Sequence, residues 1–360
     1  MNNSPKKKAI VYPYNSEFTP ILRYSSKLHQ YNVYKLIAPK SWGCVGKDAS
    51  AADEGIPLHM IVESCIDDIF DADVIIIADF PHDDIILTKV KEVITTGIQR
   101  EKEIICLKTL ADDDVAYFKK YPNFRYYNNE AVWSRRRDKT LNTVNVPIIC
   151  ICGLIDNVNK FDVQIALNEY LKMKGYKITN ITSKSYGKFL DFYPLPLSLY
   201  KNEDCITDKV NFLNNYIKSI EVKENPDAII LELPGGIMPY DDKITNNYGE
   251  IHNIVFNAVQ CDFVCLNLSY SIVTKEFLEE LRLIMKYRFN TSLDCFYFSN
   301  KNISKISLDF FGKYDWQIMP KSFFTSRFNE LFENEKDNHI YNFVLEQNIK
   351  KLGDLVIDSL

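Results

Sequence analysis

Residues 147–161 read PIICICGLIDNVNKF, and the expected fold follows from this stretch. Its first part is an unbroken apolar run, which is typical of a strand buried on both faces of a parallel sheet. Gly153 ends the run, and Lys160 stands at the start of a segment, about 161–174, whose apolar residues recur at helical spacing. A buried strand, a glycine turn and a lysine at a helix N-terminus predict a phosphate-binding loop, because free N–H groups and the helix dipole favour an anion there.

The spacing within this loop is unusual. Five residues separate Gly153 from Asn159, whereas the common loop has four residues between its glycines. The longer spacing resembles that of dethiobiotin synthetase and related amide ligases, whose loop reads glycine, five residues, then Gly-Lys-Thr. The resemblance places Lys160 at the lysine position, Asn159 in place of a glycine, and Phe161 in place of the hydroxyl residue that would hold Mg²⁺.

Because phosphoryl transfer depends on the metal, the loss of this hydroxyl leaves two hypotheses. The loop is either a nucleotide site without efficient turnover or a relic that serves another ligand. For the nucleotide hypothesis, with ATP or GTP and Mg²⁺, the predicted cofactor-binding residues of the loop are Gly153, Asn157, Asn159, Lys160 and Phe161.

A second motif supports the comparison. Residues 227–239 read DAIILELPGGIMP, a buried strand that ends in Glu232 and runs into Gly235 and Gly236. The segment is similar to the VEGAGG segment of the same ligases, which implies that the glutamate lies near the metal and that the glycines let backbone approach the ligand. Both motifs would lie at the carboxyl ends of parallel strands, where open α/β sheets place ligands. The two glycines could equally mark a tight turn.

Patterns on both sides of these motifs predict an α/β protein with two parallel-sheet domains. Short apolar runs alternate with helix-length segments over residues 1–140, which indicates a Rossmann-like domain. After a polar, basic linker at 131–147, a P-loop-type domain covers 146–300 and a helical C-terminal appendage covers 301–360. The last helix is expected to pack on the second domain or on another subunit. The predicted strands are 9–12, 33–38, 73–80, 103–108, 147–154, 176–182, 227–234, 261–268 and 293–298, and the predicted helices are 84–99, 161–174, 206–222, 249–259 and 274–288.

The first domain offers candidates for substrate binding. Tyr14 and Asn15 follow its first strand, and Trp42 and Lys47 follow its second, so all four are expected at the same carboxyl edge of the sheet. Glycine, tryptophan and lysine together could hold a ligand or a peptide. A glycine-rich turn with a packed tryptophan is an equally good interpretation of the second pair.

Three other clusters have simpler interpretations. The acids Asp79, Asp83 and Asp84 with His82 could form a hard-metal or general-base site, but capping of the helix that starts there is favoured. The run 135–137, three arginines, is interpreted as a solvated linker rather than as a site for an acidic leader peptide. The nine cysteines lack zinc-site spacing and suit neither a disulfide framework nor a metal site, so most are expected to be reduced and buried.

Composition limits the class of protein. The chain has 360 residues, 46% of them hydrophobic and 25% charged, which describes a globular protein large enough for two domains. A net charge of −5 gives no global field for nucleic acid or anionic lipid. No signal-peptide core and no run of 18 apolar residues is visible, so a cytoplasmic protein without a membrane partner is expected.

The chain as a whole resembles the clostridial peptide maturation system proteins, which are found beside radical SAM enzymes and small precursor peptides in natural-product gene clusters. The resemblance rests on four segments, which are YPYNSEFTPILRY at 12–24, SWGCVGKDA at 41–49, NKFDVQIAL at 159–167 and NPDAIILELPGGIMPY at 225–240. It implies a role in making a ribosomally synthesised, post-translationally modified peptide, with the precursor peptide and the radical SAM enzyme as partners. It implies no particular reaction.

Two functional hypotheses follow. In the first, the protein is an accessory or recognition protein that binds peptide, modifying enzyme or nucleotide, which Asn159 and Phe161 favour. In the second, it is an NTP-dependent ligase that activates a carboxylate, with Lys160 neutralising phosphate charge and Glu232 or Asp156 supplying the metal contact. A homodimer is suggested by analogy with the ligases and by the apolar tail helix.

Overall fold

The computed structural model describes residues 5–80, 83–127, 140–200, 204–270, 273–303, 316–332, 339–342 and 346–360. The chain divides into two compact units. The first consists of Met1–Asn128 and Ser185–Asp191, and the second of Asn129–Lys184 and Phe192–Leu360. His82 and the arginines at 135–137 lie outside the described residues.

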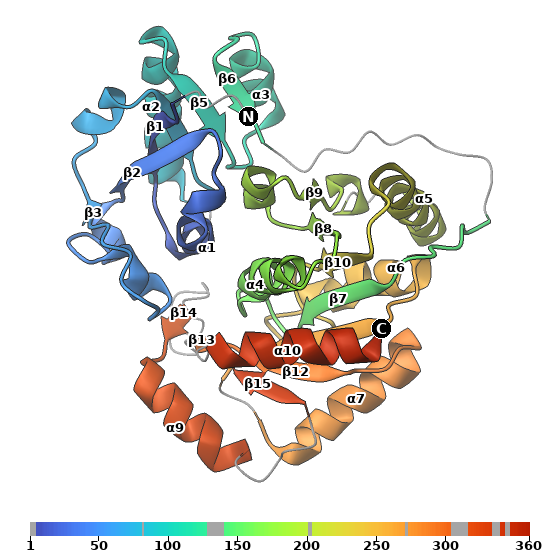
Figure 1. Ribbon diagram of the computed structural model, residues 1–360. Helices are drawn as coiled ribbons and strands as arrows, with labels where there is room; N and C mark the ends of the chain where they lie inside the picture. Colours follow the sequence, from blue (N-terminus) through green and yellow to red (C-terminus); the bar gives the residue numbers. More distant parts are fainter. Residues whose placement is uncertain are drawn as a thin grey trace. The chain divides into compact units, whose positions relative to one another are not determined.

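The first unit is built on a six-stranded parallel sheet with the order β3-β2-β1-β4-β5-β6 (Figure 1), which is the order of a Rossmann-like fold. Its strands are β1 (Lys7–Tyr12), β2 (Tyr31–Ile37), β3 (Val62–Glu63), β4 (Val74–Ile77), β5 (Glu103–Cys106) and β6 (Phe124–Tyr126). Its helices are α1 (Thr19–Arg23), α2 (Asp84–Gln99) and α3 (Asp112–Phe118). Strands β3 and β6 are too short to show as periodic runs in the sequence.

Local signals explain where α2 begins. The Asp83 carboxylate accepts hydrogen bonds from the N–H groups of Ile85 and Ile86, at 3.0 and 3.1 Å. This satisfies two of the free donors at the helix start, and the favoured capping role of Asp83 is thereby confirmed.

A short segment from later in the chain completes the first unit. Residues Ser185–Leu190 form a 3₁₀ helix whose Tyr186 and Phe189 rings pack edge-to-face on Phe18. The Tyr186 hydroxyl also donates to the Asp79 carbonyl at 3.0 Å. These contacts are non-local, so the sequence pattern does not reveal that this segment belongs with the first sheet.

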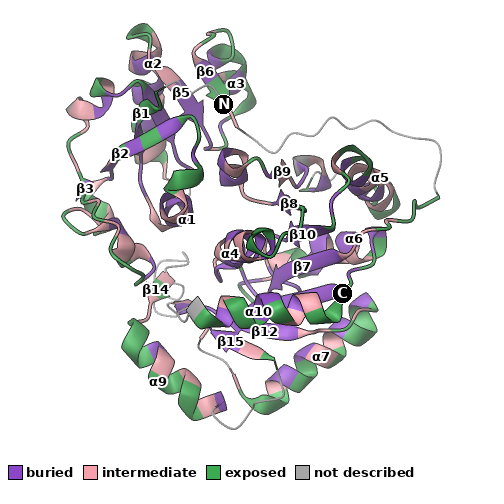
Figure 2. Cartoon of the chain, in the orientation of Figure 1, coloured by how far each residue is buried: buried purple, intermediate pink, exposed green. Residues whose placement is uncertain are grey.

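The second unit is built on a seven-stranded parallel sheet with the order β15-β12-β11-β7-β10-β8-β9. Its strands are β7 (Ile148–Gly153), β8 (Ile178–Thr182), β9 (Tyr193–Pro194), β10 (Ala228–Glu232), β11 (Phe263–Leu268), β12 (Cys295–Phe298) and β15 (Ile340–Asn342). Its helices are α4 (Lys160–Met173), α5 (Ile206–Glu224), α6 (Glu250–Ala258), α7 (Lys275–Phe289), α9 (Lys321–Phe332) and α10 (Glu346–Ser359). One face of the sheet packs against α5, α6, α7 and α9, and the other against α4 and α10. The expected α/β class with two parallel sheets is therefore confirmed, and Figure 2 shows the strands as the buried layer of each unit.

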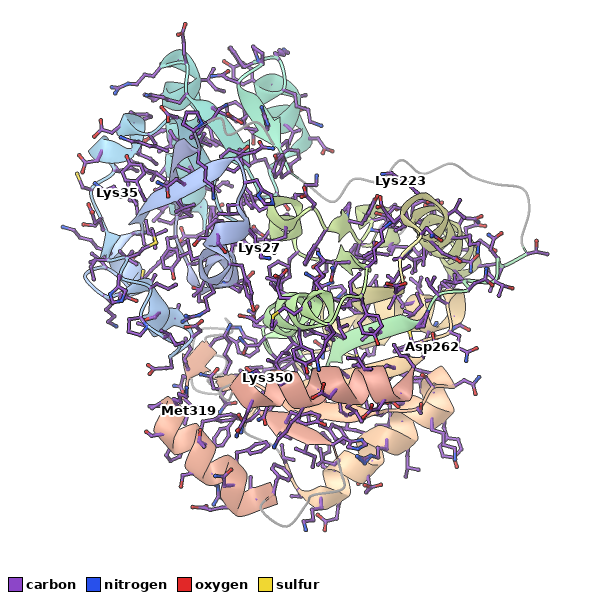
Figure 3. The ribbon with its side chains drawn as sticks, in the orientation of Figure 1. Lys27, Lys35, Lys223, Asp262, Met319 and Lys350 are labelled. Carbon is purple, nitrogen blue, oxygen red and sulfur yellow. The ribbon has the colours of Figure 1, made fainter. Side chains whose placement is uncertain are left out.

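The segment after residue 300 contains more than the expected helices. Strand β15 pairs in parallel with β12, and α10 buries Leu352 and Val356 on the sheet. A short antiparallel pair, β13 (Lys301–Ile303) with β14 (Trp316–Ile318), continues from β12. Met319, labelled in Figure 3, follows β14, and its N–H donates to the Asn300 carbonyl at 2.8 Å. The described part of the C-terminal segment thus contributes a strand to the second sheet, which the expected helical appendage did not include, and a helix that packs on it.

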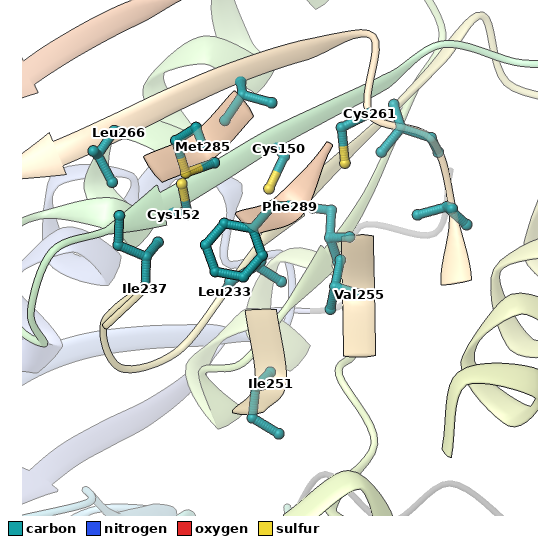
Figure 4. Close-up of a cluster of buried hydrophobic side chains, with 14 of the residues drawn as sticks. Cys150, Cys152, Leu233, Ile237, Ile251, Val255, Cys261, Leu266, Met285 and Phe289 are labelled. Atoms are coloured by element: carbon teal, nitrogen blue, oxygen red, sulfur yellow. The ribbon is translucent and has the colours of Figure 1, made fainter. Parts of the chain in front are cut away.

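The cysteines are packing residues. All nine are free thiols, and Cys106, Cys150, Cys152, Cys261, Cys265 and Cys295 are buried. Figure 4 shows Cys150, Cys152 and Cys261 among apolar side chains that include Met285 and Phe289 of α7. Within the described part of the chain, no three His, Cys, Asp or Glu side chains form a group that could hold a metal ion. None of the described helices is both long and apolar enough to cross a bilayer.

Candidate functional site

The loop between β7 and α4 occupies the predicted phosphate-binding position at the carboxyl end of the central strand. Gly153 ends β7, and a side chain there would bring a Cβ within 2.8 Å of the Ile155 carbonyl oxygen, so the tight turn requires glycine. Asn157 and Asn159 have positive φ angles of 54° and 58°, a conformation that asparagine tolerates better than most residues. The loop is therefore built by local residue preferences.

Asn159 stands in place of the expected glycine, and its side chain makes two hydrogen bonds. Its side-chain oxygen accepts a hydrogen bond from the Ser299 hydroxyl at 2.5 Å, just beyond the end of β12. Its amide group donates to the Asp162 carboxylate at 3.2 Å. The asparagine thus keeps the left-handed backbone of a glycine and also ties the loop to the neighbouring strand end.

Lys160 is folded into its own loop. Its side chain is 3% exposed, and Nζ lies 2.6 Å from the Gly235 carbonyl oxygen, 3.5 Å from the Ile155 carbonyl oxygen and 3.5 Å from Asp156 Oδ1. The N–H of Gly235 in turn donates to Asp156 Oδ1 at 3.1 Å. The nearest partner of this buried ammonium group is a neutral main-chain carbonyl, and its ion pair with Asp156 is longer, at 3.5 Å, so an anionic ligand would compete for it.

The charge state of Asp156 follows from this arrangement. Desolvation acts to raise the pKa of Asp156, but the charges of Lys160 and Lys184 and the Gly235 N–H lower it to about 2. The carboxylate is therefore ionised at neutral pH. Its side chain is 56% exposed, so Asp156 is also accessible to a ligand.

Phe161 supplies no hydroxyl group to the site. Its ring is 5% exposed and packs edge-to-face on Phe192, with the ring centroids 6.4 Å apart. The position that holds Mg²⁺ in the resembling ligases is thus part of the apolar core in this chain.

Glu232 has a buried carboxylate oxygen that suits a metal ion, because it has no hydrogen-bond partner in the part of the chain that the structure describes. The residue is fully buried, and its Oε2 accepts hydrogen bonds from the Thr182 hydroxyl at 3.0 Å and from the Ser183 N–H and hydroxyl at 2.8 and 2.7 Å. Its Oε1 has no hydrogen-bond partner among the described residues. Since Mg²⁺ takes one or two carboxylates together with phosphate oxygens and water, Glu232 Oε1 fits such an ion, whereas Phe161 does not.

Gly236 is required by packing. A Cβ on this residue would overlap the Leu154 carbonyl oxygen and the Asn246 side chain. Gly235 has a positive φ of 65°, with open space around it. The double glycine therefore makes a tight turn against the phosphate loop, and the approach of its backbone to a ligand stays a prediction.

The structure adds residues that the sequence motifs do not include. Thr182 is the last residue of β8, and Ser183 and Lys184 follow it. Lys184 is close enough to lower the pKa of Asp156. Desolvation, together with the charges of Glu232 and Asp156, raises the pKa of Tyr200. Polar residues at the end of the strand predicted at 176–182 were the available signal, because parallel strands end at a common edge.

His252 is a buried neutral base next to this loop. It is 1% exposed, and its Nε2 has no hydrogen-bond partner among the described residues. Burial lowers the pKa of His252 to about 3, and the charges of Lys160 and Arg288 act in the same direction.

Acid should destabilise the protein through His252. Because its pKa in the folded state is below the ordinary value of 6.5, the unfolded state binds the proton first, and stability is lost as the pH falls from 6.5 towards 3. By pH 5 the loss should reach about 2 kcal/mol. Urea denaturation at pH 7.5 and 5.0 should show a smaller difference for His252→Leu than for wild type. Equal pH dependence in the two proteins would contradict the assignment.

In the first unit, two of the four predicted substrate-binding residues, Tyr14 and Asn15, form hydrogen bonds with other residues of the same unit. The Tyr14 hydroxyl is buried and lies 2.8 Å from Thr19 Oγ1 and 3.0 Å from the Ala49 carbonyl oxygen, to which it donates. Asn15 Nδ2 donates to the Asp79 carbonyl, and its Oδ1 accepts from the Glu17 N–H.

The other two predicted residues, Trp42 and Lys47, are both accessible to solvent. Trp42 is half-buried against Phe80, with ring centroids 6.1 Å apart, and Lys47 is exposed. Lys108, which no sequence motif singles out, lies over the Phe80 ring at 4.6 Å and donates to the Asp79 carboxylate at 3.2 Å. Substrate binding by Trp42 and Lys47 at this edge stays a prediction.

A cavity of about 400 Å³ lies elsewhere in the first unit. Its lining includes Ile98, Tyr117, Phe118 and Tyr121, near the starts of β5 and β6. This is the amino end of the sheet, opposite to the edge where Asn15 and Asp79 meet, so the cavity is separate from the predicted substrate site.

The comparisons with known proteins bear on the fold. No protein-family model and no curated protein matches the sequence. Among solved structures, the chain is similar to a DUF1611 family protein from Anabaena variabilis, with 10% identity, a TM-score of 0.59, and coverage of 98% of this chain and 99% of that chain. It is also similar to a plasmid partition protein from Borrelia burgdorferi bound to AMPPNP (10% identity, 60% of this chain and 100% of that chain, TM-score 0.38). A third is a nucleotide-binding protein from Archaeoglobus fulgidus in complex with ADP (13% identity, 58% and 85%, TM-score 0.30). The similarity to the DUF1611 protein extends over nearly all of both chains and shows a shared fold.

Proposed function

We propose that the second unit binds a nucleoside triphosphate at residues 153–161, and that the protein acts as an accessory protein in the maturation of a ribosomally synthesised peptide. The observation that carries the nucleotide proposal is the buried Lys160 ammonium group at the start of α4, held 2.6 Å from a main-chain carbonyl oxygen. A phosphate group would replace a neutral partner with a charged one, and the helix N-terminus would add N–H donors.

The acidic residues of the site suit a metal-bound triphosphate. Mg²⁺ would neutralise phosphate charge and, with Phe161 in place of the hydroxyl, Glu232 Oε1 would be its ligand from the protein. Because Phe161 provides no hydroxyl group to hold the metal against the loop, we expect weak coupling between the metal and the loop, and therefore slow hydrolysis.

Peptide maturation rests on the sequence resemblance at 12–24, 41–49, 159–167 and 225–240. The precursor peptide or the radical SAM enzyme that modifies it would be the partner, and Trp42 and Lys47 are the candidate contacts in the first unit. In this role, nucleotide binding would change the affinity of the protein for the precursor peptide or the radical SAM enzyme.

A second function, ligation of an amide bond after activation of a carboxylate by ATP, is favoured by one observation. Glu232 is a fully buried carboxylate, and one of its oxygens has no hydrogen-bond partner within the described ranges of the chain. Such a group costs stability, and it is more typical of a catalytic site than of a recognition surface. Release of ADP that depends on addition of the precursor peptide would support this alternative over the accessory role.

Calorimetric titration with ATP and with GTP, in Mg²⁺ and in EDTA, tests the nucleotide proposal. We expect a dissociation constant on the order of micromolar for one of the two nucleotides. In Glu232→Gln the enhancement by Mg²⁺ should disappear while binding in EDTA remains. Absence of binding by wild type at millimolar nucleotide would refute the proposal. Fluorescence polarisation with the labelled precursor peptide tests the maturation role, which fails if neither the peptide nor the radical SAM enzyme binds.

A further inference from the structure

The segment that joins β10 to α6, residues 233–249, ends in an unusual turn. Its last four residues, Asn246, Asn247, Tyr248 and Gly249, have φ angles of 49°, 47°, 53° and 71°. Glycine adopts this left-handed conformation freely and asparagine tolerates it, but the Cβ of tyrosine is crowded against the following carbonyl group. Tyr248 is therefore strained, and its surroundings must hold it in place.

Several contacts hold the turn. The Tyr248 N–H donates to the Thr245 carbonyl at 2.8 Å, and the Tyr248 carbonyl accepts from the Arg288 guanidinium of α7. Gly249 has no Cβ, which would overlap the Ile237 carbonyl oxygen. The turn thus depends on the position of the residues that precede it in the same segment.

The same segment is attached to the phosphate loop. The Ile237 N–H donates to the Gly153 carbonyl at 2.9 Å, and Asn246 Nδ2 donates to the Leu154 carbonyl at 3.0 Å. Two charged groups of the loop contact Gly235. The Lys160 ammonium group donates to its carbonyl at 2.6 Å, and the Asp156 carboxylate accepts from its N–H at 3.1 Å. The strained turn is therefore held by contacts with the residues that would surround a phosphate.

We propose that the left-handed turn at residues 246–249 is a switch element that responds to occupancy of the phosphate loop, an inference that rests on the proposed nucleotide binding. A bound phosphate attracts the Lys160 ammonium group away from the Gly235 carbonyl. The segment loses its contact with the Lys160 ammonium group, and Tyr248 returns to a right-handed conformation that extends α6 towards its N-terminus. Nucleotide binding and relaxation of the turn are then linked, so a change that favours the relaxed turn also strengthens binding.

Two substitutions test the sign of this linkage. Tyr248→Gly removes the strain of the left-handed turn and disfavours a helix, so it should weaken ATP binding about fivefold. Asn247→Ala makes the left-handed turn costlier and favours a helix, so it should tighten ATP binding about fivefold. Calorimetry with Mg²⁺ and ATP gives both values. The control Tyr248→Ala removes the same ring but retains the strain, and it should change the affinity by no more than about twofold.

Amide hydrogen exchange gives an independent readout. Exchange over residues 235–250 should change when ATP is added to wild type, and this change should be smaller in Tyr248→Gly. Tyr248 is 67% exposed, so its substitutions should leave the fold intact, which thermal melts would verify. Affinity changes of the same sign in Tyr248→Gly and Asn247→Ala, or changes below twofold in both, would overturn the switch and leave nucleotide binding standing. Absence of ATP binding by wild type would overturn both proposals.

Discussion

Replacement of Lys160 by methionine should weaken ATP binding by about 100-fold, because the protein would lose its charge-assisted hydrogen bond to phosphate. Methionine keeps most of the apolar stem, which is 3% exposed and packed inside the loop. The Asp156 carboxylate loses its ion-pair partner, but it is 56% exposed and remains hydrated. The variant should therefore fold normally, and calorimetry should report a defect in binding rather than in stability.

Lys172→Met is the matched control for this prediction. Lys172 lies on the same helix, α4, and is exposed at its opposite end. We expect the control to bind ATP as wild type does, because a surface charge more than a Debye length away contributes little at physiological salt. Equal affinities for Lys160→Met and Lys172→Met would show that ATP, if bound, does not use this loop.

Gly236→Ala should strongly destabilise the protein, with a loss of about 3 kcal/mol or more in the free energy of unfolding. The added Cβ would overlap the Leu154 carbonyl oxygen, which is main chain and cannot rotate away. The tight turn after β10 would have to separate from the phosphate loop. Urea denaturation at neutral pH measures the loss.

Gly175→Ala provides the comparison for Gly236→Ala. Gly175 has a positive φ of 96° and no atom within 4 Å of the position that an added Cβ would take, so alanine there meets only backbone strain. Its cost should be about 1 kcal/mol. If Gly236→Ala lowers the free energy of unfolding no more than Gly175→Ala does, Gly236 does not lie as close to the Leu154 carbonyl as described.

Several elements can be predicted because their signals are local. The helix expected at 84–99 is α2 (Asp84–Gln99), and the strand expected at 147–154 is β7 (Ile148–Gly153). In both cases hydrophobic periodicity and a nearby capping or turn residue act over a few positions, so the sequence pattern carries the information. Short edge strands such as β3 (Val62–Glu63) and β15 (Ile340–Asn342) form only by pairing with a neighbour, and no local pattern marks them.

Some residues of the candidate site can also be identified from local sequence, whereas their partners cannot. Lys160 and Glu232 can be identified from the sequence because Glu232 ends a strongly apolar strand and Lys160 begins the helix that follows another. Glu232 accepts hydrogen bonds from Thr182 and Ser183, which lie 50 and 49 residues away in the sequence. Asn159 accepts one from Ser299, which lies 140 residues away. Contacts over such separations depend on strand order, and strand order is not encoded in the spacing of any one motif.

Local sequence was enough to specify the alternation of strands and helices, the position of the phosphate-type loop, and the capping role of Asp83. Each of these features depends on residues that are close together in the sequence. Tertiary structure was needed to establish that Asn159 binds Ser299, that Lys160 is held by Gly235, and that one oxygen of Glu232 stays open among the described residues. These groups are brought together by the order of strands in a parallel sheet. Their hydrogen bonds therefore follow from burial at a shared edge rather than from any local preference.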